Sequence, residues 1–90
     1  MKEIQWSEAK NDLLKQTRGI SFHDVVTALE QGKLLAHLRH PNQKVYAHQH
    51  VLIVVIDNYA YIVPFIEEKK YIFLKTIIPS RKMTKQYLSI

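Results

Sequence analysis

The sequence predicts one α+β domain with the element order β-α-α-β-β-β-β-α and a mainly antiparallel sheet. Two observations predict it. Apolar residues at helical spacing are confined to residues 7–32 and 81–88, whereas residues 33–78 hold β-branched runs separated by turn residues. The length of 90 residues allows a single domain spanning 1–90, and 47% hydrophobic residues with two glycines and three prolines are typical of a globular chain.

Capping residues indicate the first two helices. After a weakly alternating start that predicts a short edge strand, Ser7 is a good N-cap, and Gly19 is placed to end the helix in the left-handed conformation. Ser21 caps the next helix, Asp24 follows three residues later in the manner of a capping box, and Gly32 stops it. The two helices are expected to cover one face of the sheet.

Four strands are expected in the second half of the chain: Lys33–Leu38, Val51–Ile56, Tyr59–Ile66 and Tyr71–Ile78. The second is a continuous β-branched run and should be covered on both faces. Asp57 and Asn58 favour a tight hairpin turn, and Pro64 indicates an irregular or edge position. Pro79 ends the last strand, which leaves a short basic helix, Arg81–Leu88, for the other face of the sheet or its edge.

The net charge of +5 is unevenly distributed. Residues 1–32 have four basic and five acidic side chains, whereas residues 33–90 have nine basic and three acidic ones. No acidic residue follows Glu68, and six cations do. This asymmetry predicts a surface that meets a polyanion, with nucleic acid as the first candidate, or else a basic face that is only solvated.

The residues that the sequence lacks exclude several classes of site. Without cysteine, a disulfide framework and a cysteine nucleophile are impossible, and a reducing cytoplasm is the expected location. No apolar run approaches the roughly 20 residues that span a bilayer, and the first residues do not resemble a signal peptide, so no membrane partner is expected. A glycine-rich phosphate loop, a zinc-protease motif and a serine elbow are also missing from the sequence.

Histidine is concentrated in one segment, because four of the five lie within 14 residues: His37, His40, His48 and His50. Residues 39–49 are expected to form a loop, and His48 and His50 would share one face of an extended segment. Imidazole acts as an acid, a base or a phosphate partner near neutral pH. Because no cysteine or carboxylate stands near the cluster in the sequence, neither a metal nor another cofactor is expected. Solvated loop histidines are the alternative to proton transfer or RNA contact.

Four cations and one aromatic residue are further candidates. Lys75 stands in an otherwise apolar strand, so its ammonium group should reach a groove or a partner, or extend into solvent from an exposed face. Arg81, Lys82 and Lys85 open the last helix, where cations oppose the helix dipole, so an anionic partner and a solvated surface both remain open. Tyr46 lies in the polar loop and could stack on an unpaired base or anchor the loop.

Two parts of the sequence resemble the BrnT family of toxins. The family's opening motif is matched by IQWSEAKN at residues 4–11 and by GISFHDV at residues 19–25. Its closing motif is similar to IIPSRKMTK at residues 77–85. The matches cover nearly the whole chain in the right order.

The resemblance implies a RelE-like fold and the toxin component of a type II toxin–antitoxin system. Such toxins are metal-independent endoribonucleases that cleave mRNA and arrest translation. A DNA-binding antitoxin of the ribbon-helix-helix or helix-turn-helix type neutralises them, and operator DNA is bound only through that complex. The alternative is a weakly active or inactive toxin-fold module that acts by binding an antitoxin or nucleic acid.

The family usually has an arginine where this chain has His50, so His50 is either a weakened phosphate contact or a true acid or base. For cleavage by the neighbouring 2′-hydroxyl, His50 or His48 is expected to transfer protons. Arg81 and Lys82 would hold the phosphate, with Lys75 in support. The further RNA contacts expected are Lys85, Tyr46, Arg39 and His40.

Overall fold

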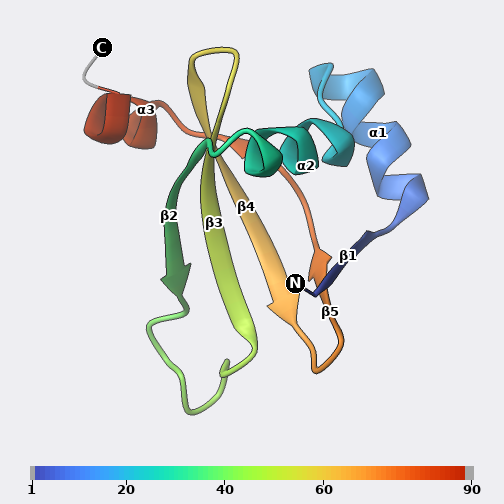
Figure 1. Cartoon of the computed structure of the whole chain (residues 1–90), viewed down its shortest axis with the longest axis vertical. Coiled ribbons are helices and arrows are strands. Elements are labelled where there is room, and N and C mark those ends of the chain that lie inside the picture. The colour runs from blue at the N-terminus through green and yellow to red at the C-terminus, as the bar shows by residue number, and fades with distance from the viewer. Residues whose placement is uncertain (1, 89–90) are drawn as a thin grey trace.

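The computed structural model describes residues 2–88 and shows three helices and a mainly antiparallel sheet (Figure 1). In chain order the elements are β1 (Glu3–Trp6), α1 (Glu8–Arg18), α2 (Phe22–Glu30), β2 (Leu34–Arg39), β3 (Gln49–Ile56), β4 (Tyr59–Glu67), β5 (Tyr71–Leu74), β6 (Ile78–Pro79) and α3 (Arg81–Leu88). The predicted α+β class and element order are confirmed, with the last predicted strand divided in two. Within residues 2–88, none of the helices combines the length and the apolar character needed to cross a bilayer.

The strands lie in the order β1-β5-β4-β3-β2, and β6 pairs with β4 beyond the end of β5. β1 and β5 run parallel, and the other pairs are antiparallel. β3 is an inner strand, and β2 forms one edge of the sheet. Leu52, Ile53 and Val54 of β3 are buried, so the strand is covered on both faces there, as its β-branched run predicts. Asp57 and Asn58 turn the chain between β3 and β4 with φ of 51° and 62°, so the predicted left-handed hairpin turn is confirmed.

The predicted helix caps are also confirmed. The Ser7 side chain accepts a hydrogen bond from the Lys10 N–H, and Gly19 ends α1 with φ of 65°. Ser21 and Asp24 form a complete capping box at the start of α2. Ser7, Ser21 and Asp24 thus satisfy backbone N–H groups that would otherwise be unpaired at the start of α1 and α2, and Gly19 ends α1.

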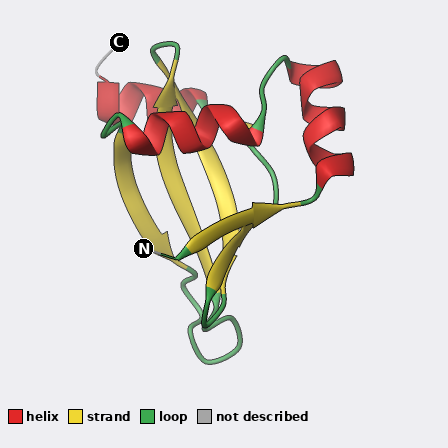
Figure 2. Ribbon diagram, turned by 45° about the vertical axis from the view of Figure 1, so that its right-hand side comes forward, coloured by secondary structure: helices red, strands yellow, loops and turns green. Residues whose placement is uncertain are grey.

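α2 packs on one face of the sheet, which we call the inner face, whereas α1 lies to its side beyond the end of β1 and reaches the core through Leu14 (Figure 1). α2 crosses the strands near the β3–β4 hairpin and leaves the opposite half of the inner face without a helix (Figures 1 and 2). Phe22 and Val25 of α2 are fully buried against Val54 and Val63 of the central strands. These contacts hold α2 against the hairpin end of the sheet, and Leu52 and Phe65 extend the core towards the other end.

α3 packs on the other, outer face. The Thr84 hydroxyl accepts a hydrogen bond from the Ala60 N–H at 2.9 Å and donates one to the Ser80 carbonyl at 2.7 Å. Ala60 alternates with the inner-face residues Tyr61 and Val63, and it is fully buried. This agrees with the expectation that the basic C-terminal segment occupies the face opposite the first two helices.

The prediction of a single long strand over Tyr71–Ile78 is wrong, because β5 ends at Leu74 and β6 begins at Ile78. The three residues 75–77 face only two residues of β4, Val63 and Pro64, because the register changes between the pairs Phe65–Leu74 and Ile62–Ile78. The Lys75 N–H donates to the Pro64 carbonyl at 2.8 Å, but Pro64 has no N–H to return a bond. Pro64 therefore marks an irregularity, as predicted, but in an inner strand and not at an edge.

Candidate functional site

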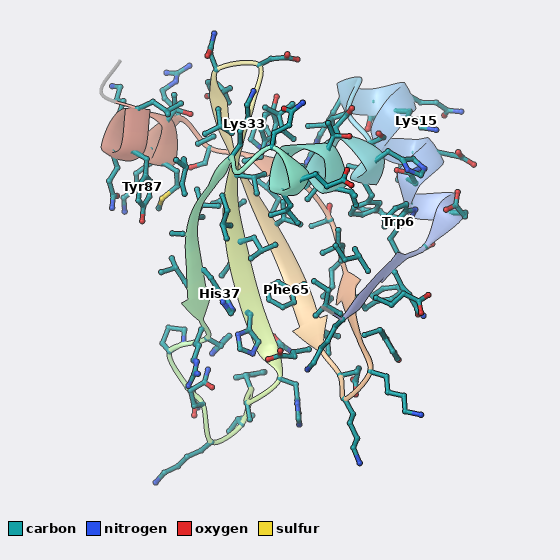
Figure 3. All side chains as sticks on the ribbon, viewed as in Figure 1. Trp6, Lys15, Lys33, His37, Phe65 and Tyr87 are labelled. Atoms are coloured by element: carbon teal, nitrogen blue, oxygen red, sulfur yellow. The ribbon has the colours of Figure 1, made fainter. Side chains whose placement is uncertain are left out.

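His50 lies near the start of β3 on the inner face, in the half of the sheet that α2 leaves uncovered. It is paired in register with Phe65 of β4 and with Arg39 of β2. Its side chain is only 6% exposed, and its ring stacks on the Phe65 ring with centroids 5.2 Å apart. Figure 3 shows His37 and Phe65 on this same part of the sheet. The packing fixes the position of the His50 ring.

Both ring nitrogens of His50 face another titratable side chain. Nδ1 lies 2.9 Å from Nε2 of His37, and Nε2 lies 3.4 Å from Oε1 of Glu67. The other Glu67 oxygen accepts a hydrogen bond from Lys2 Nζ at 3.1 Å, and Lys2 also donates to the Glu68 carbonyl at 2.7 Å. We call His37, His50, Glu67 and Lys2 the histidine chain.

The charges of the histidine chain assign its protons. An ionised Glu67 favours the proton of His50 on Nε2, although 3.4 Å is longer than an ordinary direct hydrogen bond. Nδ1 of His50 is then an acceptor, so His37 Nε2–H donates to it. The remaining nitrogen of His37, Nδ1, accepts no hydrogen bond from residues 2–88. Because His37 is exposed while His50 is buried, the available base is His37.

Burial and the nearby negative charge shift the pKa of His50 in opposite directions. Burial lowers the pKa of His50 below its ordinary value, and the nearby Glu67 carboxylate opposes that shift. The hydrogen bond from Lys2 lowers the pKa of Glu67. At neutral pH, His50 is therefore a neutral imidazole and Glu67 a carboxylate, which agrees with the proton assignment above.

An open cleft of about 560 Å³ lies beside the histidine chain, between α2 and the inner face. His37, Glu67 and Lys2 contribute to its rim, and its walls are apolar: Ile4, Leu29, Leu34, Leu52 and Ile72 are among them. His37 is thus next to an apolar surface from which water is easily displaced.

Four of the predicted site residues lie in the β2–β3 loop or next to it, at the same end of the sheet as the histidine chain: Arg39, His40, Tyr46 and His48. Arg39 is exposed and shares the inner face with His50, since the two are partners in register. The His40 and Tyr46 rings contact each other across the β2–β3 loop, with ring centroids 4.2 Å apart, so Tyr46 anchors the loop and still exposes 39% of its surface. His48 is exposed in the turn before β3, and its carbonyl accepts a hydrogen bond from the Glu67 N–H at 2.8 Å.

The remaining predicted residues lie elsewhere, and the structure does not bring them to His50. α3 is attached to β4 at Ala60, five residues from the His50 partner Phe65, or about 17 Å along a strand. It is also on the opposite face. Arg81, Lys82 and Lys85, which we call the α3 cations, are exposed there, and Lys75 is exposed beside Pro64. A single site that combines His50 with these four cations is therefore not formed.

Sequence reasoning missed Glu67 and Lys2 and left His37 without a role. Glu67 lies just beyond the predicted strand Tyr59–Ile66, but in the structure it ends β4 and contacts His50 because the β3–β4 register brings the two strand ends together. The length of the hairpin, counted from the Asp57-Asn58 turn, is the signal that would have placed them together. Within residues 2–88, no group of three or more histidine, cysteine or acidic side chains is arranged to hold a metal ion.

The residues that carry the family resemblance serve mainly to hold the fold together. Asn11 is fully buried, and its side-chain oxygen accepts a hydrogen bond from the Phe22 N–H at 2.8 Å, which joins α1 to α2. In the closing motif, Ser80 caps α3 and Thr84 fixes it to the sheet. The exposed α3 cations are the residues of that motif left free to meet a partner.

Comparisons of the chain with protein-family models, with curated proteins and with solved structures found no match.

Proposed function

We propose that this protein is the toxin of a type II toxin–antitoxin system and acts in the cytoplasm as a metal-independent endoribonuclease. The observation that carries the proposal is the exposed imidazole of His37, whose Nε2 is hydrogen-bonded to the buried His50. Glu67 and Lys2 in turn fix the charge next to His50. A base that is oriented in this way by a second group is the usual arrangement for proton transfer.

The proposed reaction is an attack by the 2′-hydroxyl of RNA on the neighbouring phosphorus. Nδ1 of His37 takes the hydroxyl proton, the new 2′-oxygen–phosphorus bond forms, and the bond to the 5′-oxygen breaks. Arg39 binds the phosphate and stabilises the charge that develops on it. His48, exposed two residues before His50, is the candidate acid that protonates the departing 5′-oxygen. His50 acts as a positioning residue.

The charge around the histidine chain supports RNA as the substrate. Residues 33–56 contain three lysines or arginines, four histidines and no acidic residue. An exposed arginine in such a segment can hold a phosphate through two parallel hydrogen bonds. The Tyr46 and His40 rings, which contact each other in the loop, would contact a neighbouring nucleotide in this proposal.

The α3 cations support the partner part of the proposal. Among the described residues, Arg81, Lys82 and Lys85 form no ion pair. We expect an acidic surface of a DNA-binding antitoxin, of the ribbon-helix-helix or helix-turn-helix type, to cover them. Operator DNA is then reached only through that complex.

The proposal is tested by incubating the purified chain with RNA in EDTA. We expect cleavage, and we expect the variant His37→Ala to lose it while His23→Ala retains it, because His23 is an exposed histidine of α2 outside the histidine chain. Activity that disappears on chelation and returns with a divalent ion would contradict the metal-independent reaction.

A second candidate is a binding module without catalysis. It is favoured by the distance between the α3 cations and the histidine chain, because those cations can bind an anionic partner whether or not His37 acts on RNA. The absence of RNA cleavage under all conditions, together with retained binding to RNA or to an antitoxin, would select this function.

A further inference from the structure

The outer edge of β2 is unpaired within the part of the chain that the structure describes. β2 ends the strand order, and its partner is β3. Four of its residues, Leu34, His37, Leu38 and Arg39, are exposed. Apart from the β2–β3 ladder, no hydrogen bond of residues 2–88 involves the main chain of His37 or Arg39. An exposed edge strand is a template on which another strand can pair.

The ladder shows which backbone groups face outward. The His40 N–H donates to the Gln49 carbonyl at 3.1 Å, so these two form a hydrogen-bonded pair. Pairs alternate in an antiparallel ladder, which makes Arg39 and His37 members of pairs that are not hydrogen-bonded to β3. The N–H and C=O groups of His37 and Arg39 therefore point to the free edge, while their side chains lie on the inner face.

The positive charge around this edge favours a partner with acidic residues. Lys33 precedes β2, Arg39 ends it and Lys44 lies in the loop that follows. No acidic residue occurs between residues 33 and 56. The nearest carboxylates across the cleft are Glu67, which is engaged by Lys2 and His50, and the exposed Glu30 at the end of α2. Leu34 and Leu38, each 43% exposed, add apolar surface on the two faces of the strand.

We propose that the edge of β2 binds an extended acidic segment of a partner protein, which pairs with the main chain of His37 and Arg39 as an added strand. Backbone hydrogen bonds would give affinity, and carboxylates near Lys33, Arg39 and Lys44 would give selectivity. Alternate side chains of the added strand then lie beside His37 and Arg39 on the inner face. The docked segment covers the histidine chain, and this inhibitory consequence, unlike the docking itself, rests on the proposed function.

The docking is tested without RNA, using synthetic octapeptides as probes. One alternates valine with glutamate, and the other alternates valine with lysine. In amide hydrogen exchange followed by NMR, the glutamate peptide should slow exchange at His37 and Arg39, and its affinity should exceed that of the lysine peptide by roughly ten-fold. Equal protection by both peptides, or protection at other residues only, overturns the proposal.

Two variant pairs separate backbone pairing from charge. Arg39→Pro removes an outward N–H together with the side chain, whereas Arg39→Ala removes the side chain alone, so proline should weaken glutamate-peptide binding by roughly a further five-fold. Charge reversal at Lys33 and Lys44 should weaken it strongly, and reversal at Lys10 and Lys15 of α1 should not. Equal binding by the proline and alanine variants overturns strand pairing, provided that both keep the folded spectrum.

A second copy of this chain is the competing occupant. It predicts dimers that form with increasing protein concentration and that protect the His37 and Arg39 amides without any peptide. Such protection overturns the proposal in favour of an edge-to-edge dimer. Failure of RNA cleavage, by contrast, leaves the peptide result intact, so the docking and the proposed function can fail independently.

Discussion

The two ends of the sheet hold their polar groups in different ways. Next to the β2–β3 loop, His50 is buried and each of its nitrogens faces another titratable group. Next to the β3–β4 hairpin, α3 presents the exposed cations Arg81, Lys82 and Lys85 (Figure 1). Proton transfer requires fixed geometry, whereas binding to an extended anionic partner requires accessible charge. The first end is therefore suited to chemistry and the second to association.

The largest effect is expected at His37. His37→Ala should lower the rate of RNA cleavage by roughly 10²–10⁴-fold, because it removes the proton acceptor, and it should leave RNA affinity nearly unchanged. Single-turnover kinetics with a separate binding measurement distinguish the two. The matched control is His23→Ala. A variant that cleaves like the parent would show that the histidine chain is not the catalytic site.

The contrast between the two ends also explains what the sequence could predict. The α3 cations, the helix caps and the hairpin turn are local features, and residues close in sequence specify them. The contact between His50 and Glu67 depends on the register of two strands, which local patterns do not fix. The interruption at Lys75 likewise depends on its position opposite Pro64, so the run Tyr71–Ile78 looked like one strand.

A smaller effect is expected at Glu67. Glu67→Gln keeps the shape of the side chain but removes the charge that orients His50, so cleavage should fall by roughly 10-fold to 100-fold. Loss of the carboxylate also removes the influence that raises the pKa of His50, so the pH–rate profile should change shape. Glu68→Gln, at an exposed neighbour, is the control. An unchanged profile with a reduced rate would indicate a structural role alone.

The histidine chain should also make stability depend on pH. Burial lowers the pKa of His50 in the folded state, so below its ordinary value of 6.5 the unfolded chain binds a proton that the folded chain does not. The free energy of unfolding should therefore fall as the pH drops from about 7 towards 5. Glu67, whose pKa is lowered, acts in the same direction at more acidic pH.

Urea unfolding at several pH values measures this dependence. His50→Gln should flatten it between about pH 5 and 7, since the titrating group is gone, whereas His23→Gln should not. A slope that survives in His50→Gln would mean that other groups carry it. In that case the titration of His50 would not distinguish the buried end of the sheet from the exposed one.

The smallest effect is expected at α3, and it tests the other side of the comparison. Arg81→Ala should weaken binding of an anionic partner by only a few-fold, because the charge is exposed and screened by salt. For RNA, the slope of log affinity against log salt should decrease by about one phosphate contact if Arg81 touches the strand. The rate of cleavage of bound RNA should stay that of the parent, since α3 lies on the outer face and the histidine chain on the inner one. Lys15→Ala on α1 removes an equally exposed cation away from α3 and should change neither quantity. If Arg81→Ala instead reduced the single-turnover rate as strongly as His37→Ala, the two ends would act as one site. Because α3 and the histidine chain lie on opposite faces, such a joint site would require α3 to move.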